Sequence, residues 1–263
     1  MKVFRLTAVF LFFTAMMNAD AQDFKKYDRG NYIHGQDSIY YRILFPENFD
    51  PKQSYPVVFF LHGSGERGSD NEKQLLHGGT LFLSRAARKQ FPAIVVFPQC
   101  SEDSFWSNVD IAPDASGKRS FNFRTAGRPT KSMHALLGMI DNFLAKPYVD
   151  KNRVYVGGLS MGGMGTFELL RRRRKTFAAA IAICGGDHVA NVRKYKKIPL
   201  WIFHGEKDDV VPVTLSTAVA DQLRVLNVTP RITLYPNDNH NSWDSAFAEP
   251  ELLPWLFGNQ KSK

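Results

Sequence analysis

The sequence VYVGGLSMGGMG, residues 154–165, is the stretch that decides the fold of this chain. A run of β-branched and aromatic residues, which favours a β-strand, ends at two glycines. A single serine follows, and then three more glycines. Residues 158–162 fit the pattern G-x-S-x-G, in which the serine occupies a sharp turn between a strand and a helix. The alternative is a glycine-rich loop with no chemical role, and the rest of the sequence has to decide between the two.

The glycines have a physical reason in the first interpretation. A nucleophile on such a turn sits in a strained backbone conformation, and side chains beside it would collide with the neighbouring strand and helix. Ser160 would also lie at the N-terminus of the following helix, where the positive potential favours developing negative charge. We therefore expect Ser160 to be an exposed nucleophile.

Apolar runs along the chain predict a sheet of about eight strands. Two alternating stretches, NYIHG and SIYYRILFP, predict an antiparallel hairpin that turns near Gln36 and Asp37. Continuous apolar runs, typical of strands covered on both faces, follow it. They are YPVVFFLHG, AIVVFPQ, RVYVGG, AAAIAICGG, IPLWIFHG and RITLYP.

Helical patterns fall between most of these runs. They cover residues 81–90, the segment after Thr130, residues 162–174, residues 214–227 and the C-terminal PELLPWLF. Alternating strands and helices predict an α/β protein with a mostly parallel eight-stranded sheet and helices on both faces. Residues 101–129, rich in Asp, Ser, Gly and Arg, are expected to form a long loop.

The N-terminus has the pattern of a secretory signal peptide. A basic start, MKVFR, precedes the apolar run LTAVFLFFTAMM and a small-x-small cleavage site at residues 19–21. The prediction is a signal peptide over residues 1–21, a single domain over residues 22–263, and a secreted or periplasmic protein. No membrane anchor is expected after cleavage, because no further apolar run approaches the roughly 20 residues of a membrane span.

The chain is basic, with a formal net charge of +9. The densest basic run is RRRRK, residues 171–175, at an expected helix end. Cations there favour the negative end of the helix dipole, so a solvated helix terminus is the preferred interpretation over a binding patch. No nucleic-acid motif surrounds it, and no nucleic-acid partner is expected. Cys100 and Cys184 end two strands that two others should separate, which favours buried thiols over a disulfide.

A serine hydroxyl needs a base that takes its proton, and the base needs a carboxylate that orients it. In sheets of this kind the chain order is Ser, then Asp or Glu, then His. His240 follows the last expected strand, as required, whereas His188 and His204 precede the acid candidates. We expect His204 to be a structural residue at a strand end. The acid should lie in HGEKDDVVP, which offers Glu206, Asp208 and Asp209.

The reaction also needs two backbone N–H groups to hold an oxyanion. Met161, directly after the nucleophile, supplies one, and the loop HGSGERG supplies the other. Ser64 is the preferred donor in this loop and Gly65 the reserve, while His62 is expected to brace it. No spacing predicts a zinc site, and the reaction needs no metal or cofactor.

Four stretches together resemble a family of secreted α/β-hydrolase serine esterases. They are LHGSGERGSDNEKQL, GLSMGGMGT, HGEKDDVVP and NHNSWD. The resemblance is to the phospholipase/carboxylesterase, dienelactone-hydrolase-like and polyhydroxybutyrate-depolymerase/feruloyl-esterase-like groups, and it extends over residues 32–257. It implies an α/β-hydrolase fold and a triad of Ser160, Asp208 and His240. In this family the acid is the fourth residue after the His of HGxxDxxVP, which is Asp208 here.

These observations favour a secreted serine hydrolase that cleaves carboxylic esters through an acyl-enzyme on Ser160. The resemblance suggests acetyl or feruloyl esters, as small molecules or linked to polysaccharide. Two alternatives stay open. One is a prolyl-oligopeptidase-like peptidase, which usually carries an additional propeller domain. The other is a non-catalytic hydrolase-fold binding protein whose basic surface binds acidic polysaccharide.

Overall fold

The structure of the protein is a computed structural model that describes residues 23–115 and 117–261. The predicted signal peptide, residues 1–21, lies outside these ranges. Within them, no helix combines the length and the apolar character that crossing a membrane requires.

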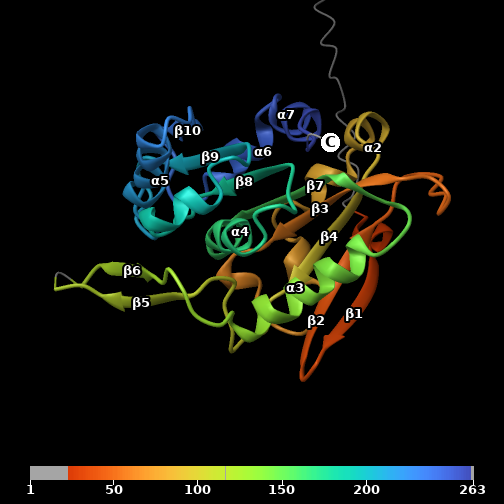
Figure 1. The fold of residues 1–263 in the computed structure, drawn as a ribbon, viewed down its shortest axis with the longest axis horizontal. Helices are drawn as coiled ribbons and strands as arrows, with labels where there is room; N and C mark the ends of the chain where they lie inside the picture. Colours follow the sequence, from red (N-terminus) through yellow and green to blue (C-terminus); the bar gives the residue numbers. More distant parts are fainter. Residues whose placement is uncertain (1–22, 116, 262–263) are drawn as a thin grey trace, which may run out of the picture.

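The centre of the fold is an eight-stranded sheet with the strand order β1-β2-β4-β3-β7-β8-β9-β10 (Figure 1). The strand β1 (Asp28–His34) pairs antiparallel with β2 (Asp37–Leu44), which pairs antiparallel with β4 (Ile94–Gln99). All later neighbours are parallel. They are β3 (Tyr55–Leu61), β7 (Val149–Leu159), β8 (Ala179–Ile183), β9 (Leu200–Gly205) and β10 (Arg231–Tyr235). The predicted hairpin, eight-stranded sheet and α/β-hydrolase fold are confirmed.

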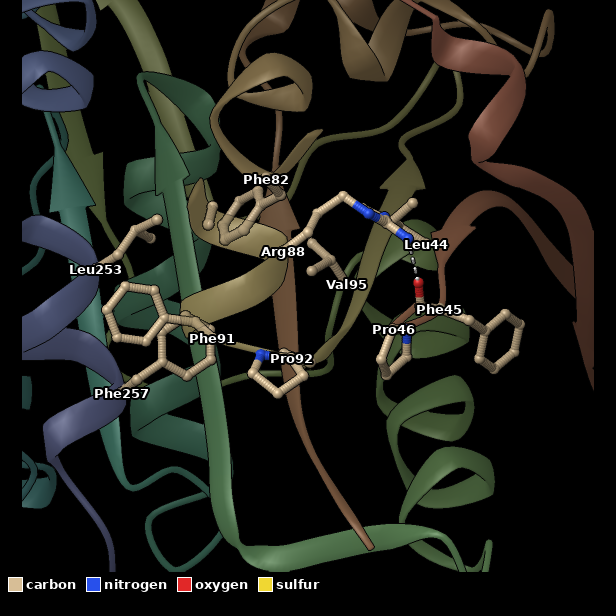
Figure 2. A pocket seen from close by; sticks show the side chains of 12 residues that line it. Leu44, Phe45, Pro46, Phe82, Arg88, Phe91, Pro92, Val95, Leu253 and Phe257 are labelled. Atoms are coloured by element: carbon tan, nitrogen blue, oxygen red, sulfur yellow. Dashed lines mark hydrogen bonds between the residues drawn. The ribbon is translucent and has the colours of Figure 1, made fainter. Parts of the chain in front are cut away.

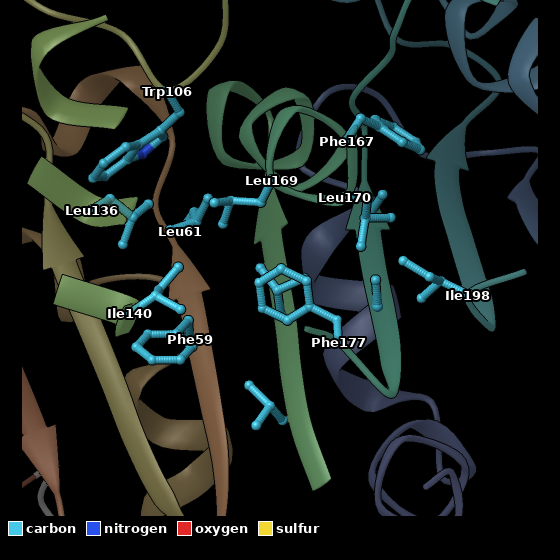
Figure 3. Packing of buried hydrophobic residues seen from close by; sticks show 14 of the residues in the cluster. Phe59, Leu61, Trp106, Leu136, Ile140, Phe167, Leu169, Leu170, Phe177 and Ile198 are labelled. Carbon is cyan, nitrogen blue, oxygen red and sulfur yellow. The ribbon is translucent and has the colours of Figure 1, made fainter. Parts of the chain in front are cut away.

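Helices cover both faces of the sheet and create two hydrophobic cores. One core lies beneath α3 (Lys131–Leu144), α4 (Met161–Arg172) and α5 (Thr214–Val225). In it, Phe59 and Leu61 of β3 pack near Leu136 and Ile140 of α3 (Figure 3). The second core lies beneath α1 (Gly79–Leu83), α2 (Arg85–Gln90), α6 (Trp243–Ala248) and α7 (Leu252–Gly258). Four short 3-10 turns complete the described chain: η1 (Phe24–Lys26), η2 (Ser64–Glu66), η3 (Lys73–Leu75) and η4 (Val189–Lys194).

The helix expected over residues 81–90 is two helices. Ser84 has an extended ψ of 138° and separates α1 from α2. Its hydroxyl accepts a hydrogen bond from the N–H of Ala87 at 3.2 Å, so it acts as the N-cap of α2. Serine favours this position because its side chain replaces a missing backbone acceptor.

The expectation of a long loop over residues 101–129 is wrong for its middle part. The strands β5 (Val109–Pro113) and β6 (Arg119–Phe123) pair antiparallel and project from the body of the protein (Figure 1). The hairpin is anchored at its base, where Phe123 is buried with Met164 of α4 and Val211. The pairing places Val109, Ile111, Phe121 and Phe123 on one face and Asp110 and Asn122 on the other. This alternation covers only three residues in each strand, which is too short to identify a strand from the sequence.

The basic run at residues 171–175 does end a helix, but it is not simply solvated. Arg171 is buried, and both Arg171 and Arg172 pair with the buried carboxylate of Glu168, at 2.5 and 2.6 Å. Only Arg174 and Lys175 of this run are fully exposed. The interpretation as a solvated helix terminus therefore holds for the end of the run alone.

The two cysteines are free and buried, as expected. Cys100 follows β4 and Cys184 follows β8, and β3 and β7 lie between these strands. Burial raises the pKa of the Cys100 thiol to about 11, so it stays protonated near neutral pH.

A small apolar pocket lies at the edge of the second core, between α2, β4 and α7 (Figure 2). Its volume is about 10 Å³, enough for about one water molecule. Phe82, Phe91, Leu253 and Phe257 contribute to its walls, and none of the predicted catalytic residues does. This pocket is a packing feature of the core and too small for a substrate.

Candidate active site

Ser160 lies between the last residue of β7 and the first of α4, at the carboxyl end of the parallel strands. Its backbone has φ 54° and ψ −118°, a conformation that costs about 1–3 kcal/mol for a residue with a side chain. Two hydrogen bonds hold it there. Its N–H donates to the carbonyl of Ile183 at 2.9 Å, and its own carbonyl accepts from the N–H of Met164 at 3.0 Å.

The glycines around Ser160 allow three backbone segments to approach one another. A Cβ atom on Gly162 would lie 2.0 Å from the carbonyl oxygen of Leu61 in β3. A Cβ atom on Gly158 would lie 2.5 Å from the carbonyl oxygen of Gly162. Both contacts are with backbone, which cannot move aside as a flexible side chain can. The expected collision of flanking side chains is confirmed, and it favours the sharp turn over an ordinary glycine-rich loop.

The three residues expected to form the triad are joined by two hydrogen bonds. The Oγ of Ser160 lies 2.9 Å from Nε2 of His240, and Nδ1 of His240 lies 2.8 Å from Oδ2 of Asp208. A carboxylate only accepts, so Nδ1 of His240 carries the proton and Nε2 is free to accept the hydroxyl proton of Ser160. This is the arrangement that activates a serine.

The side chain of Asp208 is fully buried and saturated with hydrogen bonds. Its Oδ1 accepts from the backbone N–H groups of Val210 and Val211, at 2.9 and 2.8 Å. Its Oδ2 faces both His240 and His204. Burial alone would raise the pKa of Asp208, but hydrogen bonds from His204, His240 and Val211 outweigh it and hold the pKa well below its usual range. The carboxylate therefore stays ionised beside His240.

His204 was expected to be a structural residue at a strand end, and it is buried at the end of β9. Its Nε2 lies 2.9 Å from the carbonyl oxygen of Val211 and 3.1 Å from Oδ2 of Asp208. Because both oxygens are acceptors, Nε2 must carry a proton. Its Nδ1 lies 2.7 Å from Oγ of Ser216. The sequence indicated a structural histidine but not its contact with Asp208.

A second connection ties the loop of the acid to the loop of the base. The side-chain carbonyl of Asn239 accepts from the N–H of Asp209 at 3.0 Å and from the N–H of His240 at 2.7 Å. The loops approach closely at Gly205, where a Cβ atom would lie 2.4 Å from the carbonyl oxygens of Asp238 and Asn239. Neither contact was predicted, because Asn239 and Gly205 belong to segments far apart in the chain.

The other candidates for acid and base lie elsewhere. Glu206 and Asp209 are exposed, and neither side chain contacts His240 among the described residues. The Nδ1 of His188 accepts from the N–H of Ala190 at 3.1 Å and caps η4. Asp208 is thus the carboxylate that the fold brings to His240.

The expected oxyanion donors flank Ser160. Met161 is the first residue of α4, so its N–H has no partner within the helix. Gly63 packs against Ser160, since a Cβ atom on Gly63 would lie 3.7 Å from Cβ of Ser160, and Ser64 follows Gly63 at the start of η2. Among the described residues, no acceptor is found for the N–H of Ser64 or of Met161. Both groups are free to bind a ligand.

His62 braces this loop, as expected. Its Nε2 accepts from the N–H of Cys100 at 2.9 Å, and its Nδ1–H donates to the carbonyl of Gly63 at 2.6 Å. The carbonyl of His62 accepts from the indole N–H of Trp106 at 3.2 Å. Burial lowers the pKa of His62 to about 4, so the ring is neutral near pH 7 and keeps this pattern.

Two further side chains near His240 were not predicted. The ring of Trp243 lies edge-on to the ring of His240, with centroids 5.4 Å apart, and His77 lies 5.0 Å beyond Trp243. Trp243 begins α6, a helix of only six residues that the sequence patterns do not reveal. This aromatic contact limits how far the imidazole of His240 can turn.

Among the described residues, one group of side chains has atoms close enough to bind a metal ion together: Cys184, Asp208 and His240, within 4.8 Å of one another. Asp208 and His240 already bond to each other, and burial raises the pKa of the Cys184 thiol far above neutrality. A thiol ligand must lose its proton to bind a metal, so these residues are a poor fit for one.

Residues 49–249 match the sequence family described as Phospholipase/Carboxylesterase. The chain is 34% identical over 170 residues to a bifunctional acetylxylan esterase/xylanase of Neocallimastix patriciarum, which covers 64% of this chain and 21% of the relative. It is 25% identical over 239 residues to dipeptidyl-peptidase 5 of Porphyromonas gingivalis, which covers 75% of this chain and 32% of the relative. The chain thus spans a third or less of these two relatives.

The structure is also similar to solved hydrolases. A crystal structure of a thermostable esterase superposes with a TM-score of 0.81 and 33% sequence identity, over 90% of this chain and 64% of that one.

Proposed function

This chain belongs to the phospholipase/carboxylesterase family, and from this we propose that it hydrolyses carboxylic esters through an acyl-enzyme on Ser160. The observation that carries the proposal is the chain of hydrogen bonds from Ser160 through His240 to the buried carboxylate of Asp208, at 2.9 and 2.8 Å. Similarity to a thermostable esterase, at 33% identity, supports it.

In the first half of the reaction, Oγ of Ser160 attacks the ester carbonyl while its proton moves to Nε2 of His240. The ionised Asp208 stabilises the imidazolium that forms. When the tetrahedral intermediate collapses, the bond between the carbonyl carbon and the alcohol oxygen breaks, and the alcohol leaves with the proton from His240. The acyl group stays on Ser160.

In the second half, water replaces the alcohol. His240 takes a proton from the water, whose oxygen attacks the acyl-enzyme, and then returns that proton to Oγ of Ser160 as the carboxylic acid leaves. The net reaction consumes one ester and one water and yields one acid and one alcohol. The protein needs no cofactor for any of these steps.

The negative oxygen of both tetrahedral intermediates lies between the N–H groups of Met161 and Ser64 in this proposal. Each such donor contributes about 2.7–4 kcal/mol to the transition state. The free N–H groups at both positions and the short distance from Gly63 to Ser160 support the assignment.

We further propose that the protein acts outside the cytoplasm on acetyl or feruloyl esters carried by polysaccharide. The relative named as a bifunctional acetylxylan esterase/xylanase supports the acetyl ester in particular. The signal-peptide pattern of residues 1–21 supports export, because a polysaccharide substrate is met outside the cell.

The test is hydrolysis by the mature chain, residues 22–263, of short and long p-nitrophenyl esters, methyl ferulate and acetylated xylan. The matched control is Ser160→Ala, which removes one oxygen atom. We expect turnover with the wild type and a loss of at least about 10³-fold with the variant. Equal rates in both proteins would contradict the proposal.

A peptidase is the second candidate, favoured by the 25% identity to a dipeptidyl peptidase. The same triad would cleave an amide, so the distinction lies in the substrate. Dipeptidyl p-nitroanilides distinguish the two: a higher kcat/KM on these than on p-nitrophenyl acetate would favour the peptidase. A protein that turns over neither substrate class would instead be a non-catalytic binding protein.

A further inference from the structure

An open basic groove lies away from the triad. Its walls come from the end of α4, with the residues that follow it, and from the end of η4, with the segment that leads from it to β9. The volume of the groove is about 610 Å³, within the range of ligand sites. Because these segments precede β8 and β9, the groove lies at the amino ends of the parallel strands, whereas Ser160 lies at their carboxyl ends (Figure 1).

Eight cationic side chains line this groove, and most of them have no anionic partner. Glu168 and Asp141 neutralise only Arg172 and Arg173. Lys194 donates to the carbonyl of Thr125 at 2.9 Å. Five cations have no ion pair or side-chain hydrogen bond within the described part of the chain: Arg174, Lys175, Arg193, Lys196 and Lys197.

The clustered cations also affect one another. The pKa of Lys194 is lowered, first by burial and then by Arg171, Arg174 and Arg193, while Asp187 acts in the opposite direction. A lysine whose charged form is disfavoured by neighbouring cations lies in a region of positive potential. An anion bound in the groove would relieve this repulsion.

The groove offers no exposed aromatic ring and no exposed apolar side chain. Tyr195 is the one aromatic residue that lines it, and Tyr195 is 1% exposed with its hydroxyl bonded to Asp187. No ring is therefore available for bases to stack on. Ile198, the apolar residue of the lining, is also buried, so no apolar side chain could insert into a bilayer.

We propose that this groove binds an acidic polysaccharide whose uronic carboxylates pair with the cations on its two walls. A hydrophilic polymer with single, spaced negative charges matches a groove that offers charge without aromatic or apolar contacts. The two walls differ in their connections, since Arg174 and Lys175 follow α4 whereas Arg193, Lys196 and Lys197 precede β9. The identity of the polymer as the carrier of the scissile ester rests on the proposed function.

The groove would then hold the polymer at a distance from the reacting ester. Helix α4 joins the two sites, with Ser160 before its first residue and Arg174 after its last. Its 12 residues are about 18 Å long. A polymer anchored in the groove raises the local concentration of its acyl groups at Ser160, which lowers KM for the polymer and leaves small esters unaffected.

The test measures binding of Ser160→Ala protein, residues 22–263, to polygalacturonate and to an uncharged xylan by affinity electrophoresis. The groove variant is Arg174→Gln/Lys196→Gln/Lys197→Gln. The matched control, Lys52→Gln/Arg85→Gln/Lys89→Gln, removes the same charge from exposed positions outside the groove.

We expect retardation by polygalacturonate and not by uncharged xylan, weakening with added salt. The groove variant should bind at least about ten-fold more weakly, and the control variant should change less than about two-fold. Equal weakening in the two variants would overturn the proposal, because binding would then follow net charge alone. Tighter binding to DNA or to anionic phospholipid vesicles than to polygalacturonate at physiological salt would also overturn it.

The same substitutions in active protein separate this proposal from the proposed function. With Ser160 intact, both triple variants should hydrolyse p-nitrophenyl acetate at the wild-type rate. A wild type without esterase activity that still binds polygalacturonate through the groove would refute the esterase and keep the binding site. A wild type with esterase activity, together with a groove variant that binds polygalacturonate as tightly as the wild type, would refute the binding site and keep the esterase.

Discussion

The Nε2 of His204 lies 3.1 Å from Oδ2 of Asp208, the same oxygen that accepts the hydrogen bond from Nδ1 of His240. Asp208 is therefore held between two histidines: His240, which faces Ser160, and His204, which lies inside the core. Both His204 and Asp208 have fully buried side chains. The contact with His204 helps to hold the carboxylate of Asp208 in its orientation toward His240.

Replacing His204 should impair catalysis through Asp208. His204→Phe removes the buried donor, and we expect the free energy of unfolding to fall by about 1–3 kcal/mol and kcat to fall about ten-fold or more. His204→Gln keeps an N–H group that can reach Asp208 and should restore part of kcat. Chemical denaturation and initial rates on p-nitrophenyl acetate measure the two effects. Identical kcat values for His204→Phe and wild type would show that His204 does not position the carboxylate.

A proline at position 64 would remove the backbone N–H of Ser64 while the chain keeps its path. Ser64 is the first residue of η2, and Gly63 before it is extended, with φ −74° and ψ −179°, a conformation that proline accepts in its preceding residue. Ser64→Pro should lower kcat about 10²–10³-fold, as the loss of one oxyanion donor does. Ser64→Ala retains the N–H and should keep the wild-type kcat. If Ser64→Pro is as active as Ser64→Ala, the second donor lies elsewhere in the loop.

Gly162 should tolerate no side chain. The Cβ atom of Gly162→Ala would meet the carbonyl oxygen of Leu61 at 2.0 Å, so β3 and α4 would have to separate. We expect a loss of about 3 kcal/mol in the free energy of unfolding, or a folded protein with a displaced Ser160 and little activity. Gly258→Ala is the control, since an added Cβ atom there has no neighbour within 4 Å. Thermal unfolding of the two variants measures the difference.

Asp187 should make stability depend on pH. Burial raises its pKa to about 6, although Asn191, His188 and Tyr195 donate hydrogen bonds to it. A carboxyl with a higher pKa in the folded protein than in the unfolded chain stabilises the fold below about pH 4 and loses that contribution as the pH rises to about 6.

As the pH rises from 4 to 7, the free energy of unfolding of Asp187→Asn should therefore increase by up to about 3 kcal/mol relative to that of the wild type. The reason is that the wild type must keep a charged carboxylate buried at the higher pH. Urea unfolding at several pH values measures this difference. Glu102→Gln, an exposed position, should follow the wild type throughout. A difference between Asp187→Asn and wild type that does not change with pH would refute the buried charge.

Strands were predictable here wherever both faces are covered. Every residue of β3, β4, β8 and β9 is buried, and each of these strands was identified from an unbroken apolar run. The hairpin β5–β6 was not identified, because its polar and apolar residues alternate over only three positions in each strand and all but Phe123 are at least partly exposed. The break between α1 and α2 was missed for a different reason: a single Ser84 that caps one helix looks like an ordinary residue of a longer one.

Some residues of the candidate site were likewise predictable from the sequence, and others were not. Ser160 and His240 follow from strand ends and chain order. Asp208 could not be separated from Glu206 and Asp209 by spacing alone, and only the resemblance to a family favoured it. Contacts such as those of His204 with Asp208 and of Trp243 with His240 depend on how β9 and α6 pack, which a single sequence does not encode locally.

Covalent labelling shows directly whether Ser160 is the nucleophile. The mature chain is incubated with a fluorophosphonate, which reacts with activated serines, and the modified residue is located by peptide mass spectrometry. We expect one adduct per chain on Ser160, which does not form in the Ser160→Ala variant and forms much more slowly in His240→Ala. A folded wild type that stays unlabelled, or that is labelled at another serine, would contradict this expectation.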